Sequence, residues 1–318
     1  MEKVIAVARR IKNKVVRARM TEGLLYRWAL YLILISVSYV FLYPLLRMVL
    51  MTFMTRGDII NPEVLWVPTR ITFNNLKVAG HVMNLPGSFW STLWFTTILA
   101  LGQTIVTSLS GYALARFNFR FKKMWFVLIL MSFVIPVPIV IIPRIMLFAG
   151  IQESAGMQMI GTIYPQLAMT LTGQGINSAI AILIFYNFFR MIPYVLDEAA
   201  MIDGASPIQV FYHVILKMSF AAITIVFLFS FVWIWNETYV SATFVRGGIE
   251  LLSLKLGGFD STFANMGTQL PGQSGEARIN EAYKMAATFI SMLPLLIVYF
   301  VAQRQFIQGI ENTGITGE

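Results

Sequence analysis

The sequence predicts an all-α membrane protein with six transmembrane helices, on three observations. Of its 318 residues, 57% are hydrophobic and only 12% are charged, whereas soluble chains carry about 25% charged residues. Six long stretches are nearly free of charge, and a membrane-spanning helix needs about 20 mostly apolar residues. The 24 Lys and Arg residues outnumber the 15 Asp and Glu residues, and many flank these stretches, as expected where basic residues set orientation in a membrane.

The first three spans are expected at residues 28–52, 89–115 and 124–143. Arg47 lies near the far end of the first span, where its long stem can reach the membrane interface. Trp90 and Trp94 open the second span as an aromatic belt. Pro136 and Pro138 are expected to kink or locally unwind the third span, because proline lacks the amide hydrogen that a helix needs.

The last three spans follow a division in a long uncharged stretch. Residues 154–189 are divided by the tripeptide GQG at Gly173 to Gly175, which predicts an interfacial or peripheral segment followed by a span from Ile176. The fifth and sixth spans are expected at residues 218–239 and 285–303, and Pro294 lies in the sixth.

Basic residues predict that both chain ends are cytoplasmic. The first 27 residues contain eight Lys and Arg residues, and Arg116, Arg120, Lys122 and Lys123 crowd the second loop, which makes both segments cytoplasmic by the positive-inside rule. Six spans then return the C-terminus to the same side and leave outer segments at about residues 54–88, 144–173 and 240–284. The basic start is expected to act as a signal anchor rather than a cleaved leader.

The N-terminal segment, residues 1–27, permits two interpretations. Val4, Ala8, Ile11 and Val15 line one face of a helix while basic residues occupy the rest, which favours an amphipathic helix on anionic lipid. A solvated basic tail that only fixes orientation fits the same pattern.

The residue inventory excludes several enzyme classes. There is no cysteine, and the two histidines, His81 and His213, stand outside any HExxH setting, so thiolate and zinc chemistry are not expected. A Walker A loop is also absent, since no Gly-Lys dipeptide occurs. Three classes remain: a channel or secondary transporter, an intramembrane enzyme, and the membrane subunit of an ATP-driven transporter. Few ionisable residues interrupt the spans, and Arg47 and Glu237 lie towards helix ends, which favours interfacial structural roles for both.

Residues 190–217 form an unusual cytoplasmic stretch between the fourth and fifth spans. The pattern predicts two short helices joined at Gly204, with Ser206 as N-cap and Pro207 at the first position of the second helix. The second helix presents an apolar stripe, made of Ile208, Phe211, Val214 and Ile215. This stripe either meets a partner or folds back on the spans of its own chain.

The segment EAAMIDGASPIQVFYHVIL, from Glu198 to Leu216, resembles the EAA loop of ABC importer permeases. Further pieces follow in the expected order and resemble the carbohydrate branch, in particular the maltose-type second permease: GYALARF at 111–117, VIPVPIVIIP at 134–143, WNET at 235–238, and MAATFISMLPLLIVYFVAQRQFIQGI at 285–310. The resemblance covers residues 24–317 and implies the type I ABC importer permease fold. One departure is Leu216-Lys217-Met218 where leucine-proline is common, so the entry into the fifth span is expected to lack the usual kink.

The resemblance also implies a function and a set of partners. It implies a non-catalytic permease, with a transmembrane domain at 28–310 and a C-terminal tail at 311–318, in the inner membrane of a bacterium. A second related permease, two ATP-binding subunits, an external solute-binding protein and a sugar are the implied partners, and nucleic acid is not among them. No cofactor is expected in this chain, because ATP and Mg²⁺ belong to the partner ATPase. The alternative is a substrate- or ion-coupled secondary transporter, and the identity of the sugar stays open.

The same resemblance implies site residues. In the ATPase-docking loop these are Asp197, Glu198, Ala199, Ala200, Asp203, Gly204, Phe211 and Ile215. Asp197 and Glu198 would offer carboxylates to basic groups of the ATPase, Ala199 and Ala200 would permit close docking, and Gly204 would form the turn. Asp203 is equally suited to cap that turn. Asn236, Glu237 and Tyr239 are candidates for the substrate pathway, since sugar recognition favours polar groups beside aromatic faces.

Overall fold

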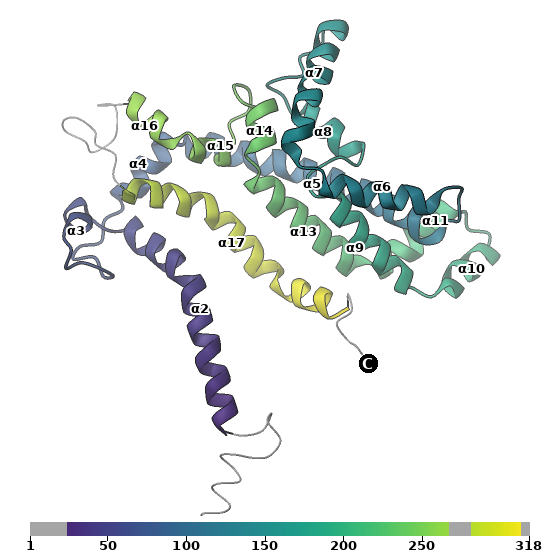
Figure 1. The fold of residues 1–318 in the computed structure, drawn as a ribbon, viewed down its shortest axis with the longest axis horizontal. Coiled ribbons are helices and arrows are strands. Elements are labelled where there is room, and N and C mark those ends of the chain that lie inside the picture. The colour runs from purple at the N-terminus through teal and green to yellow at the C-terminus, as the bar shows by residue number, and fades with distance from the viewer. Residues whose placement is uncertain (1–23, 267–280, 313–318) are drawn as a thin grey trace, which may run out of the picture. The chain divides into compact units, whose positions relative to one another are not determined.

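The computed structural model describes residues 24–266 and 281–312 (Figure 1). Helices, turns and loops make up this part of the chain, and no strand occurs within it, which confirms the all-α prediction. The expected amphipathic helix in the first residues and the end of the C-terminal tail lie outside the described residues. The chain has two compact units: residues 1–77 with 280–289, and residues 78–279 with 290–318.

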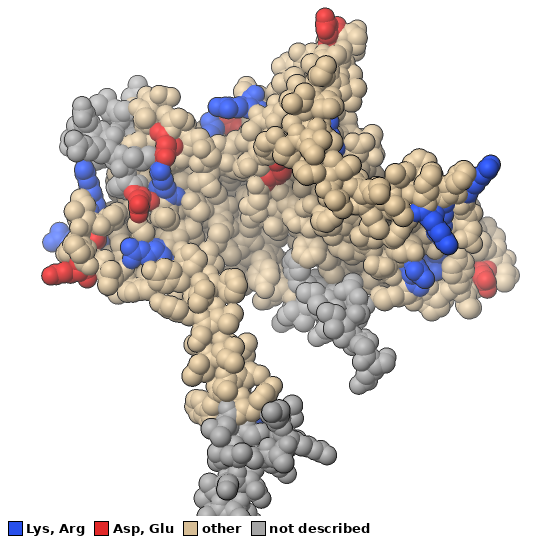
Figure 2. Space-filling model, in the orientation of Figure 1, with Lys and Arg blue, Asp and Glu red and all other residues tan. Residues whose placement is uncertain are grey.

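In the first unit, a long apolar helix ends in a hydrogen-bonded turn. Helix α2 (Leu24–Thr52) has no charged residue between Trp28 and Leu46, its apolar side chains there are exposed, and Figure 2 shows its surface as uncharged over this length. Asn75, in α4 (Asn74–Val82), closes the end of α2 by donating from Nδ2 to the carbonyls of Thr52 at 2.9 Å and Met54 at 2.8 Å. The short helix α3 (Arg56–Ile60) starts with a capping box between Thr55 and Asp58.

The second unit is organised around α5 (Leu85–Arg116). Helices α9 (Ser178–Met191), α13 (Phe220–Asn236) and α8 (Tyr164–Leu171) pack against it. Gly111 permits the close approach of α5 and α9, because a Cβ at this position would lie 2.6 Å from the Cβ of Phe185. Small residues at such crossings are typical of helix packing in membranes.

The spans agree with the sequence prediction in number but not all in place. Four helices are long and apolar enough to cross a membrane by themselves, at 26–52, 85–116, 137–155 and 281–303, and the last lies in α17 (Glu281–Asn312). Two further helix pairs, 178–202 bent by 74° and 207–236 bent by 82°, raise the number to as many as six if each pair contributes one span.

The third span is not where the sequence predicted it. Residues 124–143 are split into α6 (Lys122–Val134) and α7 (Val137–Ala155), and α7 alone has the length of a span. The break falls at Ile135 and Pro136, both in extended conformation. A residue before proline is disfavoured in the helical region and proline donates no backbone hydrogen bond, so the prolines end one helix and start another rather than bending a single one.

Short helices complete the second unit. Helix α8 occupies the segment before the fourth span that the sequence predicted as interfacial or peripheral, and it packs against α5; the chain turns after it at Gly173, which has φ +75°. After α13, three short helices follow: α14 (Tyr239–Phe244), α15 (Leu252–Gly257) and α16 (Phe259–Met266).

The entry into the fifth span is sharply bent, contrary to the expectation from the missing leucine-proline. The 82° bend falls at Ser219, between α12 (Leu216–Met218) and α13. Ser219 is fully buried, has φ −103° and ψ 17°, and donates its amide to the carbonyls of Ile215 and Leu216. The turn is thus made by backbone hydrogen bonds and burial, without proline.

Candidate functional site

The stretch after α9 folds as two short helices, as the sequence predicted. Helix α10 (Tyr194–Ile202) ends at a turn in which Gly204 has φ +88° and the amide of Ala205 donates to the carbonyl of Ala200 at 3.0 Å. This is a left-handed helix ending of the kind that glycine favours. Helix α11 (Pro207–Val210) begins with Ser206 as N-cap, and Ser206 and Gln209 form a capping box.

The continuation of α11 changes helical register. Residues 211–215 form the π-helical turn η1 (Phe211–Ile215), in which the extra residue per turn rotates the side chains that follow. Phe211 and Ile215 are buried as expected, but Ile208 is 79% exposed and Val210, which the stripe did not include, is buried. The predicted stripe was therefore wrong at Ile208, because a regular 3.6-residue period does not describe this segment.

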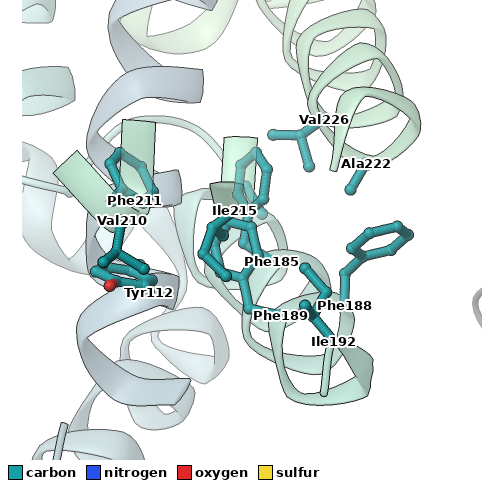
Figure 3. Packing of buried hydrophobic residues seen from close by; sticks show 11 residues of the cluster. Tyr112, Phe185, Phe188, Phe189, Ile192, Val210, Phe211, Ile215, Ala222 and Val226 are labelled. Atoms are coloured by element: carbon teal, nitrogen blue, oxygen red, sulfur yellow. The ribbon is translucent and has the colours of Figure 1, made fainter. Parts of the chain in front are cut away.

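The buried side chains of this segment pack against helices α5 and α9 of the same chain. Figure 3 shows Val210 and Phe211 beside Tyr112 of α5, with Ile215 beside Phe185 and Phe189 of α9. The Tyr112 and Phe211 ring centroids are 4.7 Å apart, and the Tyr112 hydroxyl donates to the carbonyl of Pro207 at 3.2 Å. Full burial of each apolar side chain contributes about 1.5–3 kcal/mol, so this contact anchors the second helix of the loop.

A buried ion pair anchors the first helix of the loop. The Nε of Arg116, at the end of α5, lies 3.0 Å from Oδ2 of Asp197 in α10, and both side chains are nearly inaccessible to solvent. Arg116 also donates from Nη2 to the carbonyl of Ile192 at 2.9 Å, and its guanidinium lies 4.7 Å from the ring centroid of Tyr194. The Tyr194 hydroxyl donates back to the Arg116 carbonyl. Burial raises the pKa of the Asp197 carboxyl, against the opposing effect of the Arg116 charge.

This arrangement corrects the expected role of Asp197. Its carboxylate is buried and pairs with Arg116 within the chain, so it is not part of the exposed surface of the loop. The buried side chains of Phe211 and Ile215 likewise hold the loop in place rather than present a surface. The sequence contained the partner of Asp197 in the motif GYALARF, but Arg116 there was interpreted only as one of the basic residues that set orientation.

Both helices of the loop also carry exposed residues. Glu198, Ala199, Asp203 and Gly204 are exposed and Ala200 is half-buried. Large apolar side chains lie among them, with Ile202 86% exposed and Tyr212 also exposed. We define the docking face as the exposed residues Glu198, Ala199, Ile202, Asp203, Ile208 and Tyr212. Exposed apolar surface marks an interaction site, for a protein partner or for lipid. Ile202 and Tyr212 are not among the site residues that the family resemblance implies.

The three candidates for the substrate pathway do not form a site together. Glu237 is occupied in capping α14, since its carboxylate accepts from the amides of Val240 at 2.6 Å and Ser241 at 2.8 Å. Asn236 donates to the carbonyl of Val232, and Tyr239 is exposed. Glu237 therefore has the structural role that its position near a helix end favoured.

A cavity that the sequence did not predict lies elsewhere in the second unit. Its volume is about 370 Å³, and residues of α5, α7, α8, α9 and the loop before α9 line it. Among its polar lining residues are Gln103, Arg144, Gln166, Thr170, Gln174 and Ser178. These residues are scattered over 75 positions of an otherwise apolar sequence, so no local motif marked them.

The sequence profile of one known family matches residues 103–312, and this stretch contains the loop, the docking face and all the cavity-lining residues except Leu99. The family is described as the binding-protein-dependent transport system inner membrane component. The chain belongs to this family. It is a membrane-spanning permease subunit of a binding-protein-dependent, ATP-driven importer, and the membership does not favour the alternative of a secondary transporter.

Individual relatives agree with this assignment. The permease is 24% identical over 287 residues to the osmoprotective compounds uptake permease protein GgtD of Synechocystis sp., covering 88% of this chain and 89% of the relative. It is 29% identical over 220 residues to the sn-glycerol-3-phosphate transport system permease protein UgpE of Pectobacterium atrosepticum, covering 68% and 69%.

A solved structure has the same fold. A chain of a bacterial ABC transporter involved in the import of the acidic polysaccharide alginate superposes with a TM-score of 0.68 at 19% identity, over 88% of the permease and 96% of that chain. This similarity confirms the importer permease fold. Among the described residues of the permease, no cluster of three His, Asp or Glu side chains could hold a metal ion.

Proposed function

We propose that this permease forms half of a sugar-translocating pathway and receives the motion of a separate ATPase through the docking face. The observation that carries the proposal is the two-sided loop. One side is tied to α5 by the buried pair of Arg116 and Asp197, and the other exposes Glu198 among apolar side chains. A surface that is open to a partner and rigidly joined to a transmembrane helix can transmit movement.

Two connections would carry the movement into the membrane. A displacement of α10 acts on α5 through Asp197 and through the hydrogen bond from Tyr194 to the Arg116 carbonyl. A displacement of α11 acts through Phe211 and Ile215, which pack against α5 and α9. Close-packed protein interiors have low compressibility. A displacement of the loop should therefore move α5 and α9 together with it.

Glu198 of the permease would contact a basic group of the ATPase. Ala199 and Ala200 have small side chains and would allow the ATPase to approach α10 closely. Glu198 and Ala199 are exposed, whereas Asp203 and Gly204 mark the turn at the edge of the same surface. The permease itself is non-catalytic in this proposal, and ATP with Mg²⁺ is bound by two ATP-binding subunits. A second related permease and an external solute-binding protein complete the importer.

The names of the relatives support a carbohydrate or a related polyol derivative as solute. The relatives transport osmoprotective compounds and sn-glycerol 3-phosphate, and another, 26% identical over 250 residues, is an alpha-glucoside transport system permease protein. Asn236 and Tyr239, which are exposed near the outer end of α13, are proposed to contact the solute. Glu237 stabilises the turn between them.

The proposed orientation places both ends of the permease and the docking loop in the cytoplasm. Arg120, Lys122 and Lys123, in the short segment between α5 and the start of α6, support this orientation by the positive-inside rule, and Figure 2 shows Lys and Arg side chains in the region of α6 as well as elsewhere on the surface. Reporter fusions after Phe121 should report a cytoplasmic location, and fusions within residues 267–278 an external one. The reverse result would contradict the orientation and the role of the docking face.

The function is tested with the purified assembly. The permease alone should neither bind nor hydrolyse ATP, and it should copurify with a soluble ATPase and a second permease. In proteoliposomes, uptake of a radiolabelled solute from its binding protein should require ATP and all subunits. Uptake by the permease without any ATPase, or stoichiometric ATP hydrolysis by the permease alone, would overturn the proposal.

A further inference from the structure

The cavity of the second unit is lined by both apolar and polar side chains. At about 370 Å³ it falls within the range of about 300–1,000 Å³ that is usual for small-molecule sites. Its walls combine apolar residues such as Leu99, Met169 and Ile234 with several amide and hydroxyl side chains. Sites for small polar solutes have this combination of apolar walls and a few convergent polar groups.

Arg144 contributes a full positive charge to this lining. It is the eighth residue of α7, a helix with the length and hydropathy of a membrane span, and it is half-buried. Its guanidinium donates from Nη2 to the side-chain oxygen of Gln174 at 3.3 Å. No ion pair between Arg144 and a carboxylate is found in the part of the chain that the structure describes. An arginine within a span is costly unless a partner compensates it, which makes Arg144 a candidate functional residue.

A second residue of the same lining, Gln103, has a side-chain oxygen without a hydrogen-bond partner. Gln103 is completely buried in α5, and its Nε2 donates to the carbonyl of Ile176 at 2.8 Å. Its Oε1 has no hydrogen-bond donor, although buried acceptors are almost always paired. Nearby, Gln166 donates to the hydroxyl of Ser241 at 3.1 Å and is thereby fixed in position. The cavity lining thus includes a cation on α7 and an unsatisfied acceptor on α5.

We propose that this cavity binds the anionic group of the transported solute, with Arg144 holding a carboxylate or phosphate and Gln103 receiving a hydroxyl donor. A solute that carries both groups is an acidic sugar or a sugar or polyol phosphate. This inference rests on the proposed function and narrows its substrate class. Guanidinium binds carboxylate and phosphate through charge-assisted hydrogen bonds, which are stronger than neutral ones, so Arg144 selects anionic over neutral solutes.

The test uses the assembled transporter, with both permeases and the ATPase, in nanodiscs of phosphatidylcholine. The probes are glycerol 3-phosphate, the acidic disaccharide digalacturonate and the neutral disaccharide maltose, with affinity measured by titration calorimetry. At least one anionic probe should bind more tightly than maltose. Arg144→Gln should weaken that probe about tenfold to a hundredfold, the usual range for a hydrogen bond to a charged group, and leave maltose unchanged.

Matched variants separate the charge of Arg144 from its packing. Arg144→Lys keeps the charge and should retain part of the preference for the anionic probe. Arg246→Gln removes a positive charge from an exposed position outside the cavity lining and should behave as wild type. Equal loss in Arg144→Gln and Arg246→Gln, or no loss in Arg144→Gln, would overturn the proposal.

Two other sources of a negative charge are distinguished in the same experiment. If Arg144→Gln reduces copurification of the second permease without changing probe affinity, Arg144 pairs with a carboxylate of that subunit and the proposal fails. If phosphatidylglycerol in the nanodiscs abolishes the binding of the anionic probes, a lipid headgroup occupies the cavity and the proposal also fails. ATP-dependent uptake by the same wild-type preparation is measured in parallel. Its absence would contradict the proposed function, whereas intact uptake that does not depend on Arg144 would contradict this inference alone.

Discussion

Asp197 and Glu198 are adjacent carboxylates on one helix, and the chain uses them in opposite ways. Asp197 is buried and faces Arg116, whereas Glu198 is exposed beside Ala199. The same division holds for the helix that follows, where Phe211 is buried and Ile208 is exposed. A coupling loop needs both faces, because a surface that meets a partner transmits force only if its other side is fixed.

The largest effect is expected on the inner face. Asp197→Leu would leave Arg116 buried without its counter-charge, and breaking a buried ion pair costs about 3–5 kcal/mol. We expect a strong loss of permease abundance in the membrane and of thermal stability in detergent. The double variant Arg116→Met with Asp197→Leu removes both charges and should recover much of both quantities. If the single and double variants lose equal stability, the pair does not hold the loop.

At Glu198 we expect a loss of coupling to the ATPase rather than a loss of stability. Glu198→Arg would place like charges against each other at the ATPase, with a cost of about 2–5 kcal/mol for a desolvated interfacial pair. Membrane abundance should stay near normal, because Glu198 makes no ion pair among the described residues and is exposed. Solute uptake and ATPase copurification should fail. Glu198→Gln is the milder control, and low abundance of Glu198→Arg would show that the outer face also stabilises the fold.

The turn between the two helices should show an intermediate effect. Gly204 has φ +88°, and nothing lies within 4 Å of a Cβ placed there, so Gly204→Val acts through backbone strain rather than a clash. Such strain costs about 1–3 kcal/mol. We expect a partial loss of uptake and of ATPase copurification. Gly204→Asn should be tolerated better, since asparagine enters the left-handed region more readily, and equal effects of both variants would contradict this explanation.

The smallest effect is expected from the exposed apolar residues. Ile208→Ser removes an apolar contact with the ATPase that is worth about 1–2 kcal/mol if it is buried in the assembly. ATPase affinity, measured by titrating the soluble subunit onto membranes, should fall while permease abundance stays unchanged. Val210→Ser, two residues away on the buried face, should instead reduce abundance. The reverse pattern would show that the two faces have been assigned the wrong way round.

The sequence predicted local features better than long-range ones. Apolar stretches, prolines and Gly204 were sufficient to predict most helices and the turn of the loop, because each depends on residues close together in the chain. The pair of Arg116 and Asp197 joins residues 81 positions apart, and the cavity joins residues of several helices, so neither leaves a local pattern. The π-helical turn was missed because periodicity assumes 3.6 residues per turn, and the misplaced third span shows that a proline pair can end a helix rather than bend it.

An ATPase should cover the exposed face of α10, and cysteine labelling tests this directly because the chain has no cysteine. Ala199→Cys would be labelled with a membrane-impermeant maleimide in inside-out vesicles, with and without the ATPase subunit. Lys123→Cys, in the second loop, serves as the control for a cytoplasmic position outside the docking face. We predict that position 199 reacts in the free permease and is protected by the ATPase, while position 123 reacts in both samples. Equal labelling of position 199 with and without a bound ATPase would contradict the account.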